Sequence, residues 1–162
     1  MGKSLIVALA CAVSVLATPA GATCWTSGQV SAAKVRDFDT MLMVSALRCR
    51  LTGSDLLTRY NAFVTQDRVP LTQANDVLRA HFVEKAGKHE GLNAYDNYVT
   101  KVANRYGAGA EGLTCADMVS IVNAATSETV TLEALVELAD RAKVVPLLDE
   151  QACPMTFASI AQ

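Results

Sequence analysis

The chain has 162 residues, of which 51% are hydrophobic and 19% charged, and its 14 basic and 16 acidic residues give a net charge of −2. Without a basic excess or a run of like charge, no surface for nucleic acid or for an anionic membrane is predicted. The length suits one domain that can bury a core of its own.

The first 22 residues have the pattern of a cleaved signal peptide. Lys3 precedes a short apolar run at 5–17, Pro19 ends the run, and Ala-Gly-Ala at 20–22 is a small-x-small cleavage pattern. The run is shorter than the roughly 20 apolar residues that a membrane span needs. We therefore expect a single helical domain at 23–162, periplasmic or secreted, with no membrane span after processing; an uncleaved anchor is the alternative.

The first predicted helix covers residues 31–50 and organises the rest of the chain. Its apolar side chains recur at helical spacing in a stripe wide enough to contact more than one neighbour. The stripe comprises Val35, Phe38, Met41, Leu42, Val44, Ala46 and Leu47. Before this helix, Trp25 follows Cys24, and we interpret it as a cover for one end of the core rather than an exposed ligand-stacking residue.

Two further helices follow, the second at 55–66 and the third with Pro70 in its first turn. Gly87 and Gly91 bracket a segment after the third helix that we predict to be a turn. Each glycine would cost a helix about 1 kcal/mol relative to alanine. The third helix presents an apolar side formed by Leu71, Ala74, Val77, Leu78 and Phe82.

The second half of the chain predicts three more helices. The fourth carries a stripe from Leu92 to Tyr106 and is followed by a glycine-rich loop at 107–112. Thr114, with Asp117 three residues later, predicts a capping box for the fifth helix. Thr131 caps the sixth, which ends before Pro146, and the tail is expected to be extended. With no segment of alternating polarity, the prediction is an all-α bundle of about five to six amphipathic helices.

Four cysteines remain after the leader, and an even number in an exported chain predicts two disulfides. If successive helices alternate in direction, Cys24 lies at the same end of the bundle as Cys115, and the tail can carry Cys153 back to Cys49. We therefore predict the pairs Cys24–Cys115 and Cys49–Cys153; a helix continuous through both glycines would overturn this pairing.

His81 and Glu84 are the candidate catalytic residues. His81 lies beside Leu78 and Phe82, so it points into the predicted core, and Glu84 lies one turn later. A general base or a metal ligand is one interpretation, and a hydrogen-bonded core histidine is the favoured one, because no second metal ligand stands four residues away.

Two other patterns suggest ligand sites. Residues 107–112 fit the dinucleotide pattern G-x-G-x-x-G, but they follow a helix, whereas that motif needs a preceding strand. A flexible loop is favoured, and no cofactor or metal is predicted. Tyr60, Tyr95, Tyr98 and Tyr106 could line a cavity, although at helical spacing they are more typical of a core.

The chain resembles a group of small exported proteobacterial helical proteins with four cysteines and no assigned role. The residues that carry this resemblance are Cys24-Trp25 and the segments DFDTMLMVSALRCR, LTQANDVLRAHF and LNAYDNYVTKVANRYGAG. The resemblance implies the compartment and the helical fold, and it implies no reaction.

The favoured hypothesis is therefore a binding protein of the cell envelope, with a possible protein partner and an oligomeric state that the sequence leaves open. The first alternative is a small hydrolase or metal-assisted enzyme that uses His81. The second is a small-molecule carrier with a tyrosine-lined cavity.

Overall fold

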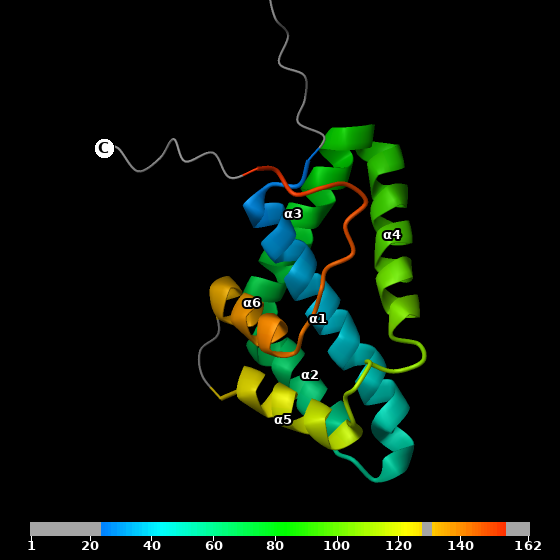
Figure 1. Ribbon diagram of the computed structural model, residues 1–162, viewed down its shortest axis with the longest axis vertical. Coiled ribbons are helices and arrows are strands. Elements are labelled where there is room, and N and C mark those ends of the chain that lie inside the picture. The colour runs from blue at the N-terminus through cyan, green and yellow to red at the C-terminus, as the bar shows by residue number, and fades with distance from the viewer. Residues whose placement is uncertain (1–23, 128–130, 155–162) are drawn as a thin grey trace, which may run out of the picture.

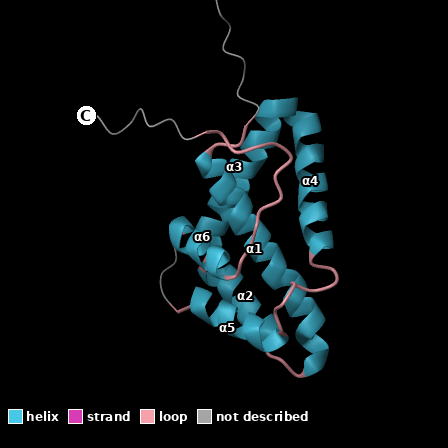
Figure 2. Cartoon of the chain, viewed as in Figure 1, coloured by secondary structure: helices cyan, strands magenta, loops and turns pink. Residues whose placement is uncertain are grey.

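The structure is a computed structural model that describes residues 24–127 and 131–154. The described chain forms six α-helices and one 3₁₀ turn and contains no β-strand (Figures 1 and 2), which confirms the all-α prediction. In chain order they are α1 (Ser27–Cys49), η1 (Arg50–Thr52), α2 (Leu56–Gln66), α3 (Arg68–Ala86), α4 (Lys88–Arg105), α5 (Cys115–Ala125) and α6 (Leu132–Arg141).

Helix α1 lies at the centre of the bundle and contacts all five other helices. It begins four residues before the predicted start, because Thr26 and Gln29 form a capping box that the prediction did not use. Its 23 residues span about 34 Å, which makes α1 the longest of the described helices. The buried side matches the predicted stripe except at Val44, which is half-buried, and at Leu47, which is 51% exposed.

Helices α2 and α3 run in the same direction along α1 (Figure 1). Asp67 alone separates them, and helical hydrogen bonds continue across it: its N–H donates to Phe63, and its carbonyl accepts from Leu71. The two helices therefore form a bent rod rather than an antiparallel pair. Pro70 lies in the first turn of α3, as predicted.

Helices α3 and α4 form a hairpin that turns at Gly87, whose φ of +78° favours glycine. Gly91 was expected in this turn but belongs to α4. A Cβ at Gly91 would lie 2.5 Å from the carbonyl oxygen of Phe82 and 2.5 Å from the Cα of Val83. Gly91 therefore allows the two helix backbones to approach closely.

Helices α5 and α6 cross the lower half of the bundle, and both begin at predicted caps. Thr114 and Asp117 form the capping box of α5, and the Thr131 side chain accepts the N–H of Ala134 at α6. Residues 144–154, here called the strap, then run back to the start of α1 (Figure 1). The Trp25 N–H donates to Gln151, and the Cys153 N–H donates to Trp25, so the predicted extended tail is anchored there.

The disulfides join Cys24 to Cys153 and Cys49 to Cys115, so the predicted pairing was wrong. That prediction counted α2 and α3 as two rods of opposite direction. Because they ascend together, α4 returns the chain to the end of α1 that carries Cys49, and Cys115 follows there. The strap is then the segment that climbs back to Cys24.

Candidate functional site

His81 is a core residue in the structure. It is 7% exposed, and its ring packs on Trp25 with 4.1 Å between the ring centroids. Burial lowers the pKa of His81 more than the nearby Asp149 raises it, which favours the neutral imidazole. Its Nε2 atom is buried without a hydrogen-bond partner among the described residues.

Glu84 is the second candidate catalytic residue. Glu84 is exposed, and no hydrogen bond links it to His81 within the part of the chain that the structure describes. No group of three or more His, Cys, Asp or Glu residues lies close enough to hold a metal ion within residues 24–127 and 131–154. The burial of His81 thus favours a core residue, but the hydrogen bond that was predicted for its ring is not formed by Nε2 within the described residues.

Trp25 closes the upper end of the core, as predicted. It is completely buried beside the Cys24–Cys153 bridge, and its Nε1–H donates to an Asp149 oxygen at 2.9 Å. Lys85 also forms an ion pair with Asp149, at 3.0 Å. These contacts hold the strap against α3 and leave Trp25 no exposed face for a ligand.

The tyrosines are mostly core residues whose hydroxyls meet polar partners. Tyr60 donates to Asp39 at 3.0 Å, Tyr95 donates to Asn75, and Tyr106 donates to Asp37. Burial raises the pKa of each of these three hydroxyls. Tyr98 and Tyr106 line two separate clefts, so these four side chains do not meet around one shared cavity.

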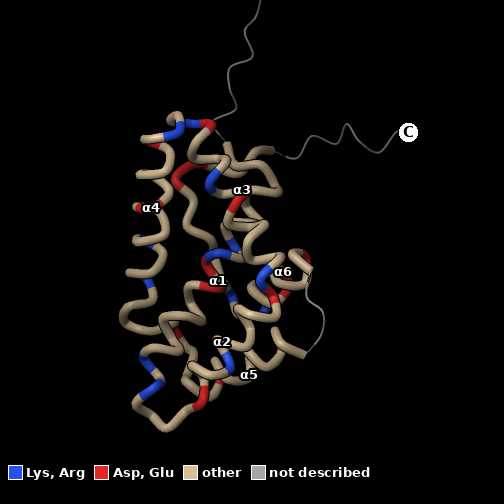
Figure 3. Tube along the Cα trace, turned by 180° about the vertical axis from the view of Figure 1, so that it is seen from behind, with Lys and Arg blue, Asp and Glu red and all other residues tan. Residues whose placement is uncertain are grey.

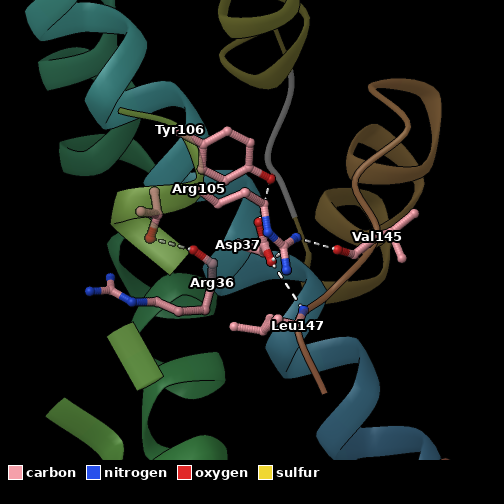
Figure 4. A network of polar contacts seen from close by, with 7 residues as sticks. Arg36, Asp37, Arg105, Tyr106, Val145 and Leu147 are labelled. Carbon is pink, nitrogen blue, oxygen red and sulfur yellow. Dashed lines mark hydrogen bonds and ion pairs between the residues drawn. The ribbon is translucent and has the colours of Figure 1, made fainter. Parts of the chain in front are cut away.

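Asp37 is the polar centre of the structure (Figure 4). It is completely buried on α1 and accepts hydrogen bonds from the Tyr106 hydroxyl, from Arg105 Nη1 at 3.1 Å and from the Leu147 N–H at 3.3 Å. Arg105 Nη1 also donates to the carbonyl of Val145 at 2.6 Å. The network thereby fixes the end of α4 and the strap against α1.

Burial raises the pKa of Asp37, and the Tyr106 hydrogen bond and the Arg105 charge oppose that rise. Asp37 was not among the functional or structural residues predicted from the sequence. A signal was available, because Ala33 and Met41 lie four residues before and after Asp37 and share its side of the helix. An acid between two apolar positions of one helix face predicts a buried, paired carboxylate.

Arg105 and Tyr106 of this network also line a cleft of about 500 Å³, here called the glycine-loop cleft. It lies between loop 107–112 and the chain that leaves α6. Met41, Tyr106 and Val144 form a buried floor, and charged residues lie at the rim. The full lining is Met41, Arg105, Tyr106, Gly109, Ala110, Glu111, Gly112, Leu113, Arg141, Ala142, Lys143, Val144 and Val145.

The loop that forms one wall of this cleft is the G-x-G-x-x-G segment. It follows helix α4, as predicted, rather than a strand. Gly109 has a φ of +110° and Gly112 a φ of +71°, and the Arg48 side chain donates to the carbonyl of Gly107. The glycines therefore serve a tight, anchored connection between α4 and α5.

A second, smaller cleft of about 370 Å³, here called the upper groove, lies between the α3–α4 hairpin and the strap. Phe82, Tyr98, Leu147 and Leu148 give it an apolar lining, and Asn97, Lys101 and Asp149 are its polar members. Only Lys101 and Asp149 carry charge there. The glycine-loop cleft is larger and carries more charged residues, so it is the stronger candidate site.

Comparisons of the chain with protein-family models, with curated proteins and with solved structures gave no match. The resemblance to small exported four-cysteine proteins therefore stays a prediction. Within the described residues, no helix is both long and apolar enough to cross a membrane. The candidate site thus rests on the geometry of this chain alone.

Proposed function

We propose that this chain is a binding protein of the cell envelope and that the glycine-loop cleft is its ligand site. The observation that carries the proposal is a preformed cleft whose floor and walls are fixed by the Asp37 network. A cleft of about 500 Å³ is within the range of small-molecule sites, which favours a small ligand over a protein partner.

The export part of this proposal is supported by two features. The two disulfides fit an oxidising compartment, and the first 22 residues, which lie outside the described residues, have the signal-peptide pattern. Both features support a periplasmic or secreted location. Charged residues of both signs are spread over the length of the molecule (Figure 3).

Binding is favoured over catalysis because the ionisable groups nearest the cleft floor are occupied by one another. Asp37 is inaccessible to solvent and accepts three hydrogen bonds, one of them from the Tyr106 hydroxyl. A general acid or base must instead reach its substrate within hydrogen-bond distance. The network therefore holds the cleft in shape and offers no group for proton transfer to a ligand.

Native mass spectrometry of protein incubated with deproteinised envelope extract tests this proposal. Ala110 lines the cleft, so Ala110→Trp should fill it, whereas Ala116→Trp places the same ring on an exposed position of α5 that does not line it. We expect the wild type and Ala116→Trp to retain a small-molecule adduct that Ala110→Trp loses. Equal retention by both tryptophan variants, or no adduct on any of the proteins, would contradict the proposal.

A further inference from the structure

Lys143 has a backbone conformation that normally belongs to glycine. Its φ is +57°, and it is the only non-glycine residue with positive φ in the described part of the chain. It follows the C-cap of α6: its N–H donates to Asp140 at 2.9 Å, and the Val144 N–H donates to Ala139 at 2.9 Å. This is the Schellman arrangement, whose left-handed position favours glycine.

A lysine at this position costs free energy that glycine would not cost, so the backbone alone does not account for it. Backbone strain by itself identifies no site. Lys143 nevertheless lines the glycine-loop cleft, and so does Arg141, two residues earlier. Neither side chain forms an ion pair with any other residue that the structure describes.

The cleft therefore holds an excess of positive charge in a chain of net charge −2. Arg105 is neutralised by the buried Asp37, with 3.1 Å between Nη1 and Oδ2. Of the remaining lining residues, Arg141 and Lys143 are cationic, and Glu111 is the single carboxylate. One uncompensated positive charge matches a ligand with a single negative charge better than a phosphate dianion.

The floor of the same cleft is apolar. Met41 is 2% exposed, Val144 is 5% exposed, and the ring of Tyr106 lies beside them in the lining. Leu113 and Val145 extend this surface toward the rim. A cationic rim above an apolar floor suits a molecule that has one charged end and a hydrocarbon body.

From these observations we infer that the glycine-loop cleft binds a small organic monoanion, a carboxylate attached to an apolar body. The carboxylate lies between Arg141 and Lys143, and the hydrocarbon rests on Met41 and Tyr106. Both cations can donate charge-assisted hydrogen bonds to it. The inference rests on the proposed function, because it names the class of ligand for that cleft.

Lys143→Gly is a sharp test because it removes the amine and installs the residue that the backbone prefers. We expect this variant to fold and to be at least as stable as the wild type to heat. Isothermal titration should show octanoate binding about tenfold more weakly to Lys143→Gly than to wild type, a change typical of one lost charged contact. Lys88→Gln, an exposed lysine at the start of α4, should leave the Kd unchanged.

Two further probes separate the charge from the hydrocarbon. Octanamide, the neutral analogue, should bind the wild type more weakly than octanoate and should not distinguish Lys143→Gly from wild type. Inorganic phosphate should bind more weakly than octanoate, because it offers nothing to the apolar floor. Raised salt should weaken octanoate binding and leave octanamide binding nearly constant.

The outcomes distinguish this inference from the proposed function. If octanoate and octanamide bound with equal affinity and Lys143→Gly changed neither affinity, the inference that the ligand is an anion would be refuted. The proposal that the cleft binds a small molecule would still stand. Stronger binding of phosphate than of octanoate would refute the inference that the ligand has an apolar body. No binding of octanoate to the wild type would refute the ligand class; the proposed function would fail as well only if Ala110→Trp and Ala116→Trp also behaved alike.

Discussion

Asp67 shows how one residue can make the stability of this fold depend on pH. It lies at the bend between α2 and α3, is 2% exposed, and has a buried Oδ2 with no partner among the described residues. Burial raises its pKa from the ordinary value to about 6. The folded protein therefore binds a proton at Asp67 more tightly than the unfolded chain does.

The sign of the pH effect follows from linkage. Between pH 4 and pH 6 the folded state holds the extra proton, so the contribution of Asp67 to the free energy of unfolding falls as pH rises and is lost above pH 6. We expect a decline of about 3 kcal/mol, since burial raises the pKa by about two units and each unit corresponds to about 1.4 kcal/mol. In Asp67→Asn this part of the decline should vanish, as urea denaturation at several pH values can measure.

Asp76→Asn, which alters an exposed carboxylate of α3, is the matched control and should keep the wild-type decline. A decline of the same size in Asp67→Asn and in the wild type would show that the bend does not hold a destabilised carboxyl. The sequence did not reveal Asp67 in this role, because its burial depends on α2 and α3 continuing in one direction.

At the scale of elements, the existence of the helices and the caps of α5 and α6 followed from the sequence, whereas the contacts between helices did not. Thr114, Asp117 and Thr131 stand in local patterns that a capping rule can identify. Gly91 instead depends on a neighbour in space, the backbone of α3, which periodicity along the chain does not reveal. Helix propensity alone placed it in a turn, and interhelical contact overrides that preference.

Gly91→Ala should therefore destabilise the protein even though alanine is the better helix former. The new Cβ would meet backbone atoms of Phe82 and Val83 at 2.5 Å, which no side-chain rotation can relieve. We expect a loss of about 2–3 kcal/mol in the free energy of unfolding, measured by chemical denaturation.

Gly28 provides the matched control because it also lies inside a helix, α1, and has no atom within 4 Å of a built Cβ. Gly28→Ala should stabilise the protein by about 0.5–1 kcal/mol. If both substitutions stabilised the protein, the close approach of α3 and α4 would be wrong.

At the scale of the molecule, the two disulfides close the opposite ends of the bundle. Cys49–Cys115 joins the end of α1 to α5, and Cys24–Cys153 joins the strap to the start of α1. The sequence predicted two bridges from the even number of cysteines. The sequence could not determine which cysteines pair, because the pairing depends on the direction of every intervening helix. One helix assigned the wrong direction places the later cysteines at the wrong end of the bundle.

Peptide mapping without reduction should recover Cys24 linked to Cys153 and Cys49 linked to Cys115. On the chain-entropy account, replacing the first pair by serine should cost about 5 kcal/mol and the second about 4 kcal/mol, because the closed loops span 129 and 66 positions. Chemical denaturation of the two double-serine variants measures which disulfide contributes more to the free energy of unfolding. Recovery of a Cys24–Cys115 peptide would refute the path described for α2 and α3.

The same scale explains why the candidate site could not be predicted. The cleft combines the loop at 107–112, the end of α6 and Met41 of α1, which are distant in sequence. The glycine loop was noted for a motif whose context it lacks, and Arg141 and Lys143 resembled ordinary charges at a helix end. The packing of α6 on α1, together with the hydrogen bonds that Asp37 accepts from Arg105, Tyr106 and Leu147, brings these segments to one place.

The most direct test of the binding account is a map of backbone amide NMR shifts on addition of the small-molecule fraction of envelope extract. The account predicts changes concentrated in residues 107–113 and 141–145, which surround the glycine-loop cleft, and their loss in Ala110→Trp. Changes centred instead on Trp25 and His81 or on the upper groove, or no changes at all, would contradict it.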